Sequence, residues 1–392
     1  MTIKTQDDLE KEIREQDPDW RPTPINETVK GMDIFLPNWI DVRSVESKNQ
    51  VWFWDNVIPS EDVTLFAGIG GVGKSSLLLG ITAATTNGHT VSICGKEILF
   101  KKGGVIYMGA EDKVASSIKP KLESMNANFD NFHYIQDLIG DRSKRRIGLS
   151  LDSNLGILES KINDVRHDEN INNISLVIID PVTYYLGNVR DHISTEVANF
   201  ILSLNVLAEK YGIAIVICKH LRKAASGANL TNLINEVGGS SAWINSPRMA
   251  WAIYEHPDDP SIKLMSNIKS NVIARDKYAY NYIIKSKKLS NGIEASFVKW
   301  GDKMIDIDPN LASNSEAYQN NKLQKAINFI FEYLESRSQC YAKDVQQAGI
   351  DDGHTKKTMR NALSTIRLKY KHIVQEDKDG TSIILKMNKY DT

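Results

Sequence analysis

One short segment limits the folds that are open to this chain: Gly68-Ile-Gly-Gly-Val-Gly-Lys74-Ser75. It fits the phosphate-loop pattern GxxxxGK followed by Ser or Thr, and it stands between an apolar run at 63–67 and a helical pattern from Ser76 onward. Its glycines let successive backbone N–H groups face phosphate oxygens, and the helix that begins near Lys74 offers its positive end to the same anion. The segment therefore predicts a nucleoside triphosphate site, with a chance glycine-rich turn as the alternative.

The side chains of this loop have separate expected roles. Lys74 should reach the β- and γ-phosphates, where one charge pair at about 4 Å contributes roughly 4 kcal/mol at an effective dielectric of about 20. Ser75 should ligate Mg²⁺. The residues expected to bind ATP are Gly68, Gly70, Gly71, Val72, Gly73, Lys74, Ser75 and Ser76.

The length and composition indicate the kind of protein that would carry such a site. With 392 residues, the chain is longer than one core usually serves, which favours two domains and an arm. Lys and Arg number 48 against 49 Asp and Glu, so any contact with nucleic acid must be local. The three cysteines, Cys94, Cys218 and Cys340, fit no metal or disulfide spacing. Because the start lacks an apolar signal core and no run approaches about 18 apolar residues, we expect a soluble, cytoplasmic protein without a membrane partner.

Three zones follow one another along the chain. Residues 1–35 are charged, carry closely spaced prolines and are expected to form an arm. From 36 to 310, short β-branched runs alternate with helical patterns, which predicts an α/β fold with a mostly parallel sheet covered by helices on both faces. A polar linker is expected at 311–320, before a small domain at 321–392. The expected strands lie at 63–67, 104–108, 175–179, 213–218, 249–253 and 263–267.

Polar residues that follow the apolar runs are the next candidates, because chemistry collects at the carboxyl ends of strands in such sheets. Asp180 ends one run and has the form of a carboxylate that holds Mg²⁺, or of a helix cap. Glu111 follows another run and is expected to orient and deprotonate a water molecule, with a surface acidic pair as the alternative. His220 follows a third and is expected to sense the γ-phosphate, although a lone histidine is often structural.

The order of these elements resembles that of RecA-like ATPases, and most closely that of RepA-type hexameric replicative helicases. The likeness covers roughly residues 36–290 and rests on the phosphate loop, Ile106-Tyr-Met-Gly-Ala-Glu111-Asp112, Val177-Ile-Ile-Asp180-Pro181, Lys219-His220-Leu-Arg-Lys223, and Gly238-Gly-Ser240-Ser241 followed by Arg248. The resemblance implies that Glu111 is the catalytic base, that Asp180 belongs to the Mg²⁺ site, and that His220 links the nucleotide state to DNA-contacting loops.

Members of that family work as rings in which a neighbouring subunit completes each ATP site. Arg248 stands where the family has the residue donated by the neighbour, and Lys269 resembles a second basic residue acting in the same way. Such a charge typically contributes roughly 10³ to 10⁵ in rate. A salt-bridged surface charge is the alternative for either. The chain has Lys219 where the commoner pattern has a second histidine, and Asn271 where relatives can have arginine. These differences weaken the prediction of unwinding more than the prediction of ATP hydrolysis.

Contacts with DNA are expected in loops that face the channel of such a ring. The candidates are Arg190 after the third strand, and Arg222 with Lys223 after the fourth; solvated loops are the alternative. The run Trp52-Phe-Trp54 fits either stacking on a base or packing, and packing is the more common use.

The C-terminal zone has a pattern of its own. Apolar residues recur at helical spacing from Leu323 to Leu334, a second short helix spans 341–348 and ends at Gly349, and a third begins at the N-cap Thr355. A hairpin at 373–385 follows, so the zone resembles a winged helix-turn-helix module. Lys and Arg outnumber Asp and Glu by 13 to 9 here, and Lys356, Lys357 and Arg360 are the expected DNA contacts. Docking to protein is the alternative use of such a module.

Together these patterns predict an ATP- and Mg²⁺-dependent motor, a homohexameric helicase that encircles single-stranded DNA and serves replication of a plasmid, phage or other mobile element. Partners of such an enzyme include a primase or an initiator. One alternative is a RecA-like switch that hydrolyses ATP without unwinding DNA and places the C-terminal module on DNA or protein. A small-molecule kinase is a further alternative, against which the chain shows no lid-like cluster of arginines.

Overall fold

The computed structural model describes residues 40–139, 146–166, 173–221, 237–274, 278–307, 315–337, 339–370, 374–379 and 382–387. The chain divides into two compact units, Met1–Asn49 and Gln50–Thr392. In the first, the described residues 40–49 include a 3-10 turn, η1 (Val42–Ser44), and the carboxylate of Asp41 accepts a hydrogen bond from the Arg43 N–H of that turn. The arm expected at 1–35 lies outside the described residues.

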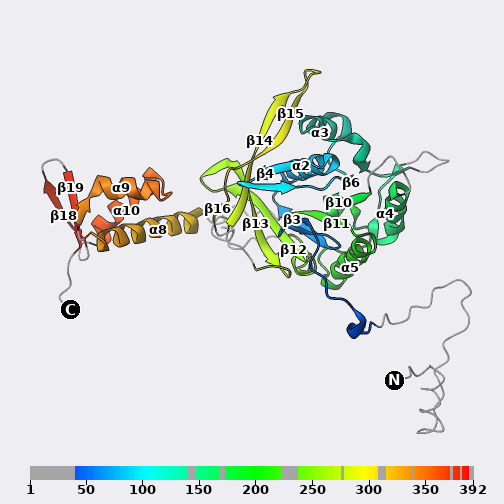
Figure 1. Cartoon of the computed structure of the whole chain (residues 1–392), viewed down its shortest axis with the longest axis horizontal. Helices are drawn as coiled ribbons and strands as arrows, with labels where there is room; N and C mark the ends of the chain where they lie inside the picture. Colours follow the sequence, from blue (N-terminus) through cyan, green and yellow to red (C-terminus); the bar gives the residue numbers. More distant parts are fainter. Residues whose placement is uncertain are drawn as a thin grey trace, which may run out of the picture. The chain divides into compact units, whose positions relative to one another are not determined.

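The larger unit is built around one sheet, and among the residues described ten strands belong to it. The strands lie in the order β15-β14-β13-β12-β3-β11-β10-β6-β7, with β16 paired to β14 (Figure 1). Every pairing from β12 through to β7 is parallel. These parallel strands are β3 (Val63–Gly68), β6 (Gly104–Gly109), β7 (Phe132–Ile135), β10 (Ile174–Asp180), β11 (Ala214–His220) and β12 (Met249–His256).

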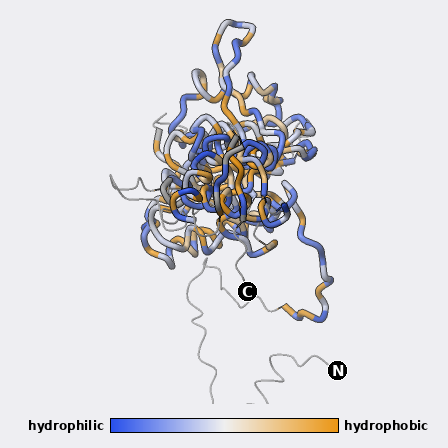
Figure 2. The backbone as a smooth tube through the Cα atoms, turned by 90° about the vertical axis from the view of Figure 1, so that its left-hand side faces the viewer, coloured by the Kyte–Doolittle hydropathy of each residue, from blue (hydrophilic) through white to orange (hydrophobic). Residues whose placement is uncertain are grey.

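Helices cover both faces of this sheet, so the predicted α/β class with a mostly parallel sheet is confirmed (Figure 1). On one face α2 (Lys74–Asn87) and α3 (Lys119–Ser124) pack over the strands, and on the other α4 (Leu151–Arg166) and α5 (Ser194–Tyr211) do so. The central strands are buried along nearly their whole length, as near-continuous apolar runs require. Figure 2 shows the same concentration of apolar residues in the interior.

An antiparallel extension lengthens the sheet beyond β12. Its strands are β13 (Asp259–Ser270), β14 (Tyr278–Lys288), β15 (Glu294–Trp300) and β16 (Ile305–Asp306). The run expected at 263–267 lies in β13, which pairs antiparallel with β12. Only a tight turn joins these two strands, and a parallel connection needs a crossover of a dozen residues or more. The extension was not predicted as such, because the later strands end in charged, exposed residues.

Shorter elements complete the unit. They are the hairpins β1 (Trp52–Trp54) with β2 (Ile58–Pro59), β4 (Thr90–Ile93) with β5 (Lys96–Leu99), and β8 (Leu138–Ile139) with β9 (Arg146–Ile147), and the short helices η2 (Val114–Ile118), η3 (Phe129–Asn131), η4 (Val182–Tyr185) and α6 (Ala242–Asn245). Among the helices that the structure describes, none has both the length and the apolar character that a membrane crossing requires.

The C-terminal residues form three helices and a small antiparallel sheet. The helices are α8 (Ser315–Glu335), α9 (Ala342–Asp351) and α10 (Lys356–Lys369), and the sheet has the order β17 (Gln339–Tyr341), β19 (Ser382–Met387), β18 (Val374–Asp379). The hydroxyl of Thr355 caps α10 as expected, by accepting a hydrogen bond from the Thr358 N–H. These helices and the two strands of the hairpin enclose their own apolar cluster.

Two boundaries in this region differ from those expected. α8 begins at Ser315, so part of the segment expected to be a linker at 311–320 is helical. Gly349, expected to end the second helix, lies inside α9. There the Met359 side chain of α10 packs so closely that an added Cβ on Gly349 would meet its sulfur at 2.5 Å. The glycine therefore serves close packing between helices.

The aromatic run before β3 packs in the core. Trp54 is buried, and its ring lies 5.6 Å from the ring of Phe100 and 5.5 Å from that of Tyr280. A ring surrounded in this way has no open face for a base, so for Trp54 the packing interpretation holds. Trp52 is only partly buried.

Replacing Trp54 with alanine should lower the free energy of unfolding by about 3–5 kcal/mol, because the substitution leaves a large cavity among aromatic rings. Trp52→Ala is the matched control and should cost much less. Urea unfolding followed by circular dichroism measures both. Equal losses for the two variants would contradict the packing role of Trp54.

Candidate nucleotide site

The phosphate loop is the connection between β3 and α2. Gly73, the last residue before α2, has a φ of +101°, a conformation that side chains other than glycine rarely adopt. Gly68 lies against the neighbouring strand, where an added Cβ would meet the carbonyl oxygen of Ile253 at 2.5 Å. These glycines let the chain leave a buried strand and begin a helix at Lys74, so the free N–H groups of the first helical turn face the site.

The Lys74 amine is buried among the acceptors of its own loop. It donates hydrogen bonds to the carbonyl oxygens of Gly68 at 2.8 Å and Ile69 at 2.9 Å, and it lies 3.3 Å from Nδ1 of His220. Burial lowers the pKa of Lys74, while the negative charges of Asp180 and Glu111 act in the opposite direction. A cation held by weak neutral acceptors gains much from an approaching phosphate.

A cavity of about 280 Å³ lies over this loop and collects residues from several strand ends. Gly71, Gly73, Lys74, Ser75 and Ser76 line it, together with Glu111, Asp180 and His220. Three other residues of the loop support it without lining it: Gly68 ends β3, Gly70 lies near the His220 ring, and Val72 is buried in the core.

Asp180 and Ser75 bring hard oxygen donors to the same cavity. Asp180 is the last residue of β10, and its Oδ2 accepts a hydrogen bond of 2.6 Å from the Tyr107 hydroxyl on the adjacent strand β6. That bond fixes the carboxylate at the edge of the cavity. A carboxylate and a hydroxyl beside a phosphate loop fit Mg²⁺, which prefers oxygen ligands and is commonly held by one or two carboxylates plus substrate phosphates.

Glu111 and Lys74 flank the imidazole of His220 on opposite sides. Nε2 lies 3.5 Å from Oε1 of Glu111, and Nδ1 faces the Lys74 amine. Because an ammonium can only donate, Nδ1 must accept, and the proton of a neutral ring is then on Nε2, directed at Glu111. The imidazole of His220 is therefore the link through which a change in charge beside Lys74 can alter the contacts of Glu111.

Further residues that line the cavity were not among the expected site residues, including Tyr107, Tyr134 and Lys121. The rings of Tyr107 and Tyr134 stack at 6.0 Å, and burial raises the pKa of Tyr134 to about 12, so both hydroxyls stay protonated donors. Lys121 of α3 forms an ion pair of 3.1 Å with Asp112, next to Glu111. The sequence shows only a tyrosine within each strand and a lysine on a helix, and their convergence depends on the pairing of β6 with β7 and β10.

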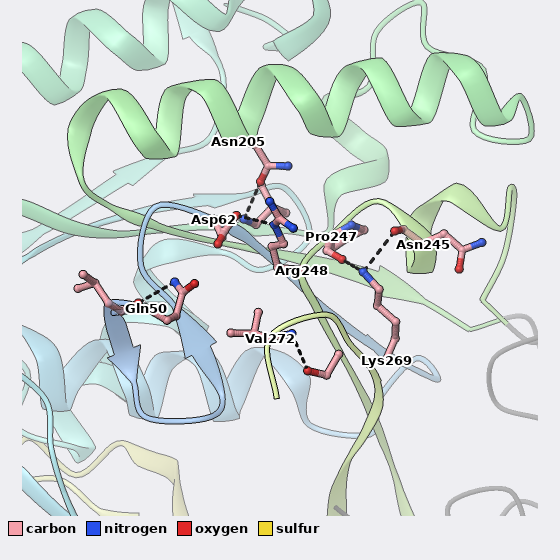
Figure 3. A network of polar contacts seen from close by, with 11 residues as sticks. Gln50, Asp62, Asn205, Asn245, Pro247, Arg248, Lys269 and Val272 are labelled. Carbon is pink, nitrogen blue, oxygen red and sulfur yellow. Dashed lines mark hydrogen bonds and ion pairs between the residues drawn. The ribbon is translucent and has the colours of Figure 1, made fainter. Parts of the chain in front are cut away.

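Arg248 and Lys269 lie at the amino ends of the parallel strands, opposite the ends where the phosphate loop lies. Arg248 immediately precedes β12, which runs parallel to β3, so it sits beside the start of β3 and the phosphate loop follows the end of that strand. Its Nε lies 3.4 Å from Oδ1 of Asp62, and its side chain is 56 % exposed (Figure 3). An ion pair this exposed stabilises the fold by at most about 1 kcal/mol.

Lys269 is close to Arg248 and is bound to backbone carbonyls. Its amine donates to the carbonyl oxygens of Pro247 and Asn245 (Figure 3). Partial burial, together with the positive charge of Arg248, lowers the pKa of Lys269 to about 8, and Asp62 acts in the opposite direction. Two basic groups thus converge at this edge beside a single carboxylate.

The expected DNA contacts are dispersed over the chain. Arg190 follows η4 in an exposed loop, where its guanidinium is paired with Glu196. Lys356, Lys357 and Arg360 are exposed in the first turns of α10. Arg222 and Lys223 lie outside the described residues.

Comparison with known proteins agrees with this geometry. A family model described as "AAA domain" matches residues 35–226, a segment that contains the phosphate loop, Glu111, Asp180 and His220. The match supports a P-loop ATPase. No curated protein matches the chain. The matched segment ends before Arg248 and Lys269, so the match does not bear on their roles.

The lowered pKa of Lys269 can be tested by competitive labelling of amines in the unliganded protein. At pH 8 about half of the Lys269 side chains should be neutral and reactive, against less than about 1 % for an ordinary lysine. Arg248→Gln removes a repelling charge, so it should raise the pKa of Lys269 and slow its labelling at pH 8. Asp62→Asn should change the rate in the opposite direction. An unchanged rate in Arg248→Gln would contradict the described contact.

Proposed function

We propose that this protein is an ATP-driven DNA motor, a ring-forming helicase that acts in replication of a plasmid, phage or other mobile element. ATP binds at the phosphate loop of one subunit, and Arg248 and Lys269 of the next subunit complete the site. The working form is a homohexamer in the cytoplasm with single-stranded DNA in its channel. A primase or an initiator is the expected class of protein partner.

The position of Arg248 is the observation that carries the shared site. Along β3, Val63 and Gly68 are separated by five residue steps, or about 17 Å at 3.3 Å per residue. An arginine beside Val63 therefore cannot reach the phosphate loop that follows Gly68 in its own subunit. In a head-to-tail ring the leading edge of one subunit meets the trailing edge of the next, which brings opposite edges of the fold together.

Within one subunit, each side chain has a defined part in hydrolysis. Lys74 exchanges its carbonyl partners for phosphate oxygens, and Glu111 orients the attacking water and takes its proton. His220, between the two, changes its contacts when the terminal phosphate is lost. Ser75 and Asp180 would hold Mg²⁺, which neutralises charge on the phosphoryl oxygens. Arg248 from the neighbour stabilises the charge that develops in the transition state.

DNA contacts are proposed at two places. Arg190 and the pair Arg222 and Lys223 belong to segments that follow β10 and β11, so both leave the sheet at its carboxyl edge. The C-terminal helices and hairpin are proposed to form a winged helix-turn-helix module. There Lys343, Arg360 and Arg367 line a cavity of about 380 Å³ beside α10, which supports a contact with phosphates.

Two inactive variants should restore activity to each other if the site is shared. Lys74→Ala lacks the phosphate-loop lysine but keeps Arg248. Arg248→Ala keeps that lysine but lacks the arginine. In an equal mixture that assembles at random, about a quarter of the sites combine an intact loop with an intact arginine. ATPase assays should therefore show at least about tenfold more turnover in the mixture than in either variant, given the size of arginine effects.

A mixture of Lys74→Ala with Glu111→Gln is the matched control, because both residues act in the same subunit and no complete site arises. Glu111→Gln alone should bind ATP normally and stop turnover. If the Arg248→Ala mixture stays at background although subunits exchange, Arg248 does not act across a subunit border.

The role of α10 predicts a change in salt dependence. Arg360→Gln should reduce the slope of log Kd against log salt concentration for DNA by about 1, because one phosphate contact is lost. Lys369→Gln, at the far end of the same helix, is the control and should leave the slope unchanged. Equal slopes for the wild-type protein, Arg360→Gln and Lys369→Gln would contradict a DNA contact at Arg360 and would favour docking to protein.

A second candidate is an ATPase switch that binds or loads proteins on DNA without unwinding it. Lys219 favours it, because the helicases that the sequence resembles more commonly have a histidine there, and here this lysine is buried in an ion pair. A strand-displacement assay separates the two functions: the helicase displaces an annealed strand with ATP, and the switch does not.

A further inference from the structure

Neighbouring residues at the end of β11 serve opposite faces of the sheet. Ile215 and Ile217 pack in the core beneath α4 and α5, whereas Val216 and Cys218 pack in the core beneath α2. Because side chains alternate along a strand, Lys219 belongs to the first face and His220 to the second. One peptide unit thus joins the imidazole of the nucleotide site to a buried ammonium on the far side of the sheet.

Lys219 is almost completely buried in a specific polar contact. Its side chain is 3 % exposed, and its amine donates a 3.0 Å hydrogen bond to Oδ2 of Asp191. The same amine lies 4.6 Å from the centre of the Trp243 ring, within the range of a cation–π contact. A buried ammonium is costly unless it is paired, so the ion pair with Asp191 helps to hold Lys219 in place.

Asp191 joins the loop that carries Arg190, a proposed DNA contact, to the segment that contains Ser240 and Trp243. It directly follows Arg190, and its backbone carbonyl oxygen accepts hydrogen bonds from the Ser240 N–H at 2.8 Å and the Trp243 indole N–H at 3.1 Å. Ser240 and Trp243 follow Lys223 by 17 and 20 residues along the chain. Asp191 therefore holds Lys219 with its side chain and Ser240 and Trp243 with its backbone.

Gly239 permits this arrangement. Its φ is +90°, and an added Cβ would meet the Asp191 carbonyl oxygen at 2.4 Å. This contact explains the glycine within the segment Gly238-Gly-Ser240-Ser241, because only a glycine lets the two backbones approach so closely. The hydroxyls of Ser240 and Ser194 hydrogen bond at 2.7 Å and tie the same point to α5.

We infer that Lys219 is a positioning residue that transmits the nucleotide state from His220 to the loop at 187–193 and the segment at 237–243. When His220 changes partners, the end of β11 moves, and the Lys219 to Asp191 bond carries that movement to both segments. The inference deepens the proposed function, because the loop at 187–193 carries Arg190, a proposed DNA contact, but the coupling itself requires no DNA. Neither Lys219 nor Asp191 lines the cavity over the phosphate loop.

Lys219→Met removes the charge and keeps an apolar chain over the Trp243 ring. Asp191 is 39 % exposed, so its carboxylate is solvated when the amine is lost, and the variant is expected to fold. Asp191→Asn is a second way to weaken the bond, placed in a loop and outside the core. If the two residues act as one unit, the double variant should show no more loss of coupling than either single variant.

Hydrogen exchange of the full-length protein, with and without a non-hydrolysable ATP analogue, measures the coupling. In the wild-type protein, the analogue should slow exchange at 187–193 and 237–243 by about fivefold or more. In Lys219→Met and in Asp191→Asn that ratio should fall below about twofold, while affinity for the analogue stays within about twofold of wild type. A purely structural role would instead raise exchange to the same extent in both states and leave the ratio intact.

Lys263→Met is the matched control. Lys263 lies on β13 of the same sheet, its side chain is 13 % exposed, and its amine forms a 2.7 Å ion pair with Glu255. This pair resembles that of Lys219 but has no link to either loop, so its loss should leave the exchange ratio unchanged. An equal effect of Lys263→Met would overturn the inference.

ATPase assays with single-stranded DNA separate this inference from the proposed function. Lys219→Met should keep its basal rate within about twofold of wild type and lose most of the stimulation by DNA. If wild-type hydrolysis ignores DNA but the exchange ratios behave as described, the motor is wrong and the coupling stands. If the wild-type ratio does not change with nucleotide, or if both variants retain it, the coupling is wrong whatever DNA does.

Discussion

Parallel pairing of the central strands decides where the chemistry of this protein lies. β3, β11, β10 and β6 all end at the same edge, with His220 opposite Gly68 and Asp180 opposite Gly109. Each strand has to contribute only one polar residue at its end, so the rest of its length can stay apolar and buried. The phosphate loop, the candidate base and the proposed carboxylate ligand of Mg²⁺ therefore meet although they are far apart in sequence.

The same pairing separates the two halves of the proposed shared site. β12 lies beside β3 and runs in the same direction, so the residue that precedes β12 is held at the edge opposite the phosphate loop. Asp62 keeps the exposed guanidinium of Arg248 in place there, and the Lys269 amine is bound to neighbouring carbonyls. Both groups are fixed by local contacts of modest strength, which suits the exchange of partners that the proposed shared site requires.

Local sequence patterns predicted much of this arrangement, but contacts between residues far apart in the sequence could not be predicted. The phosphate loop is a contiguous motif, and Asp180, Glu111 and His220 could be found because each follows an apolar run. Nothing local marks the hydrogen bond from Tyr107 to Asp180 or the ion pair of Lys121 with Asp112, since both depend on strand register and helix placement. Gly349 was misread for a related reason: contact with Met359 outweighs the tendency of glycine to end a helix.

The alternation of side chains along β11 has an evolutionary consequence. Adding or deleting one residue within the strand would exchange the sides on which Lys219 and His220 emerge, and would disable both the nucleotide site and the loop anchor in one event. Changes in length are therefore barred between 214 and 220. Homologues should keep this strand free of insertions and deletions.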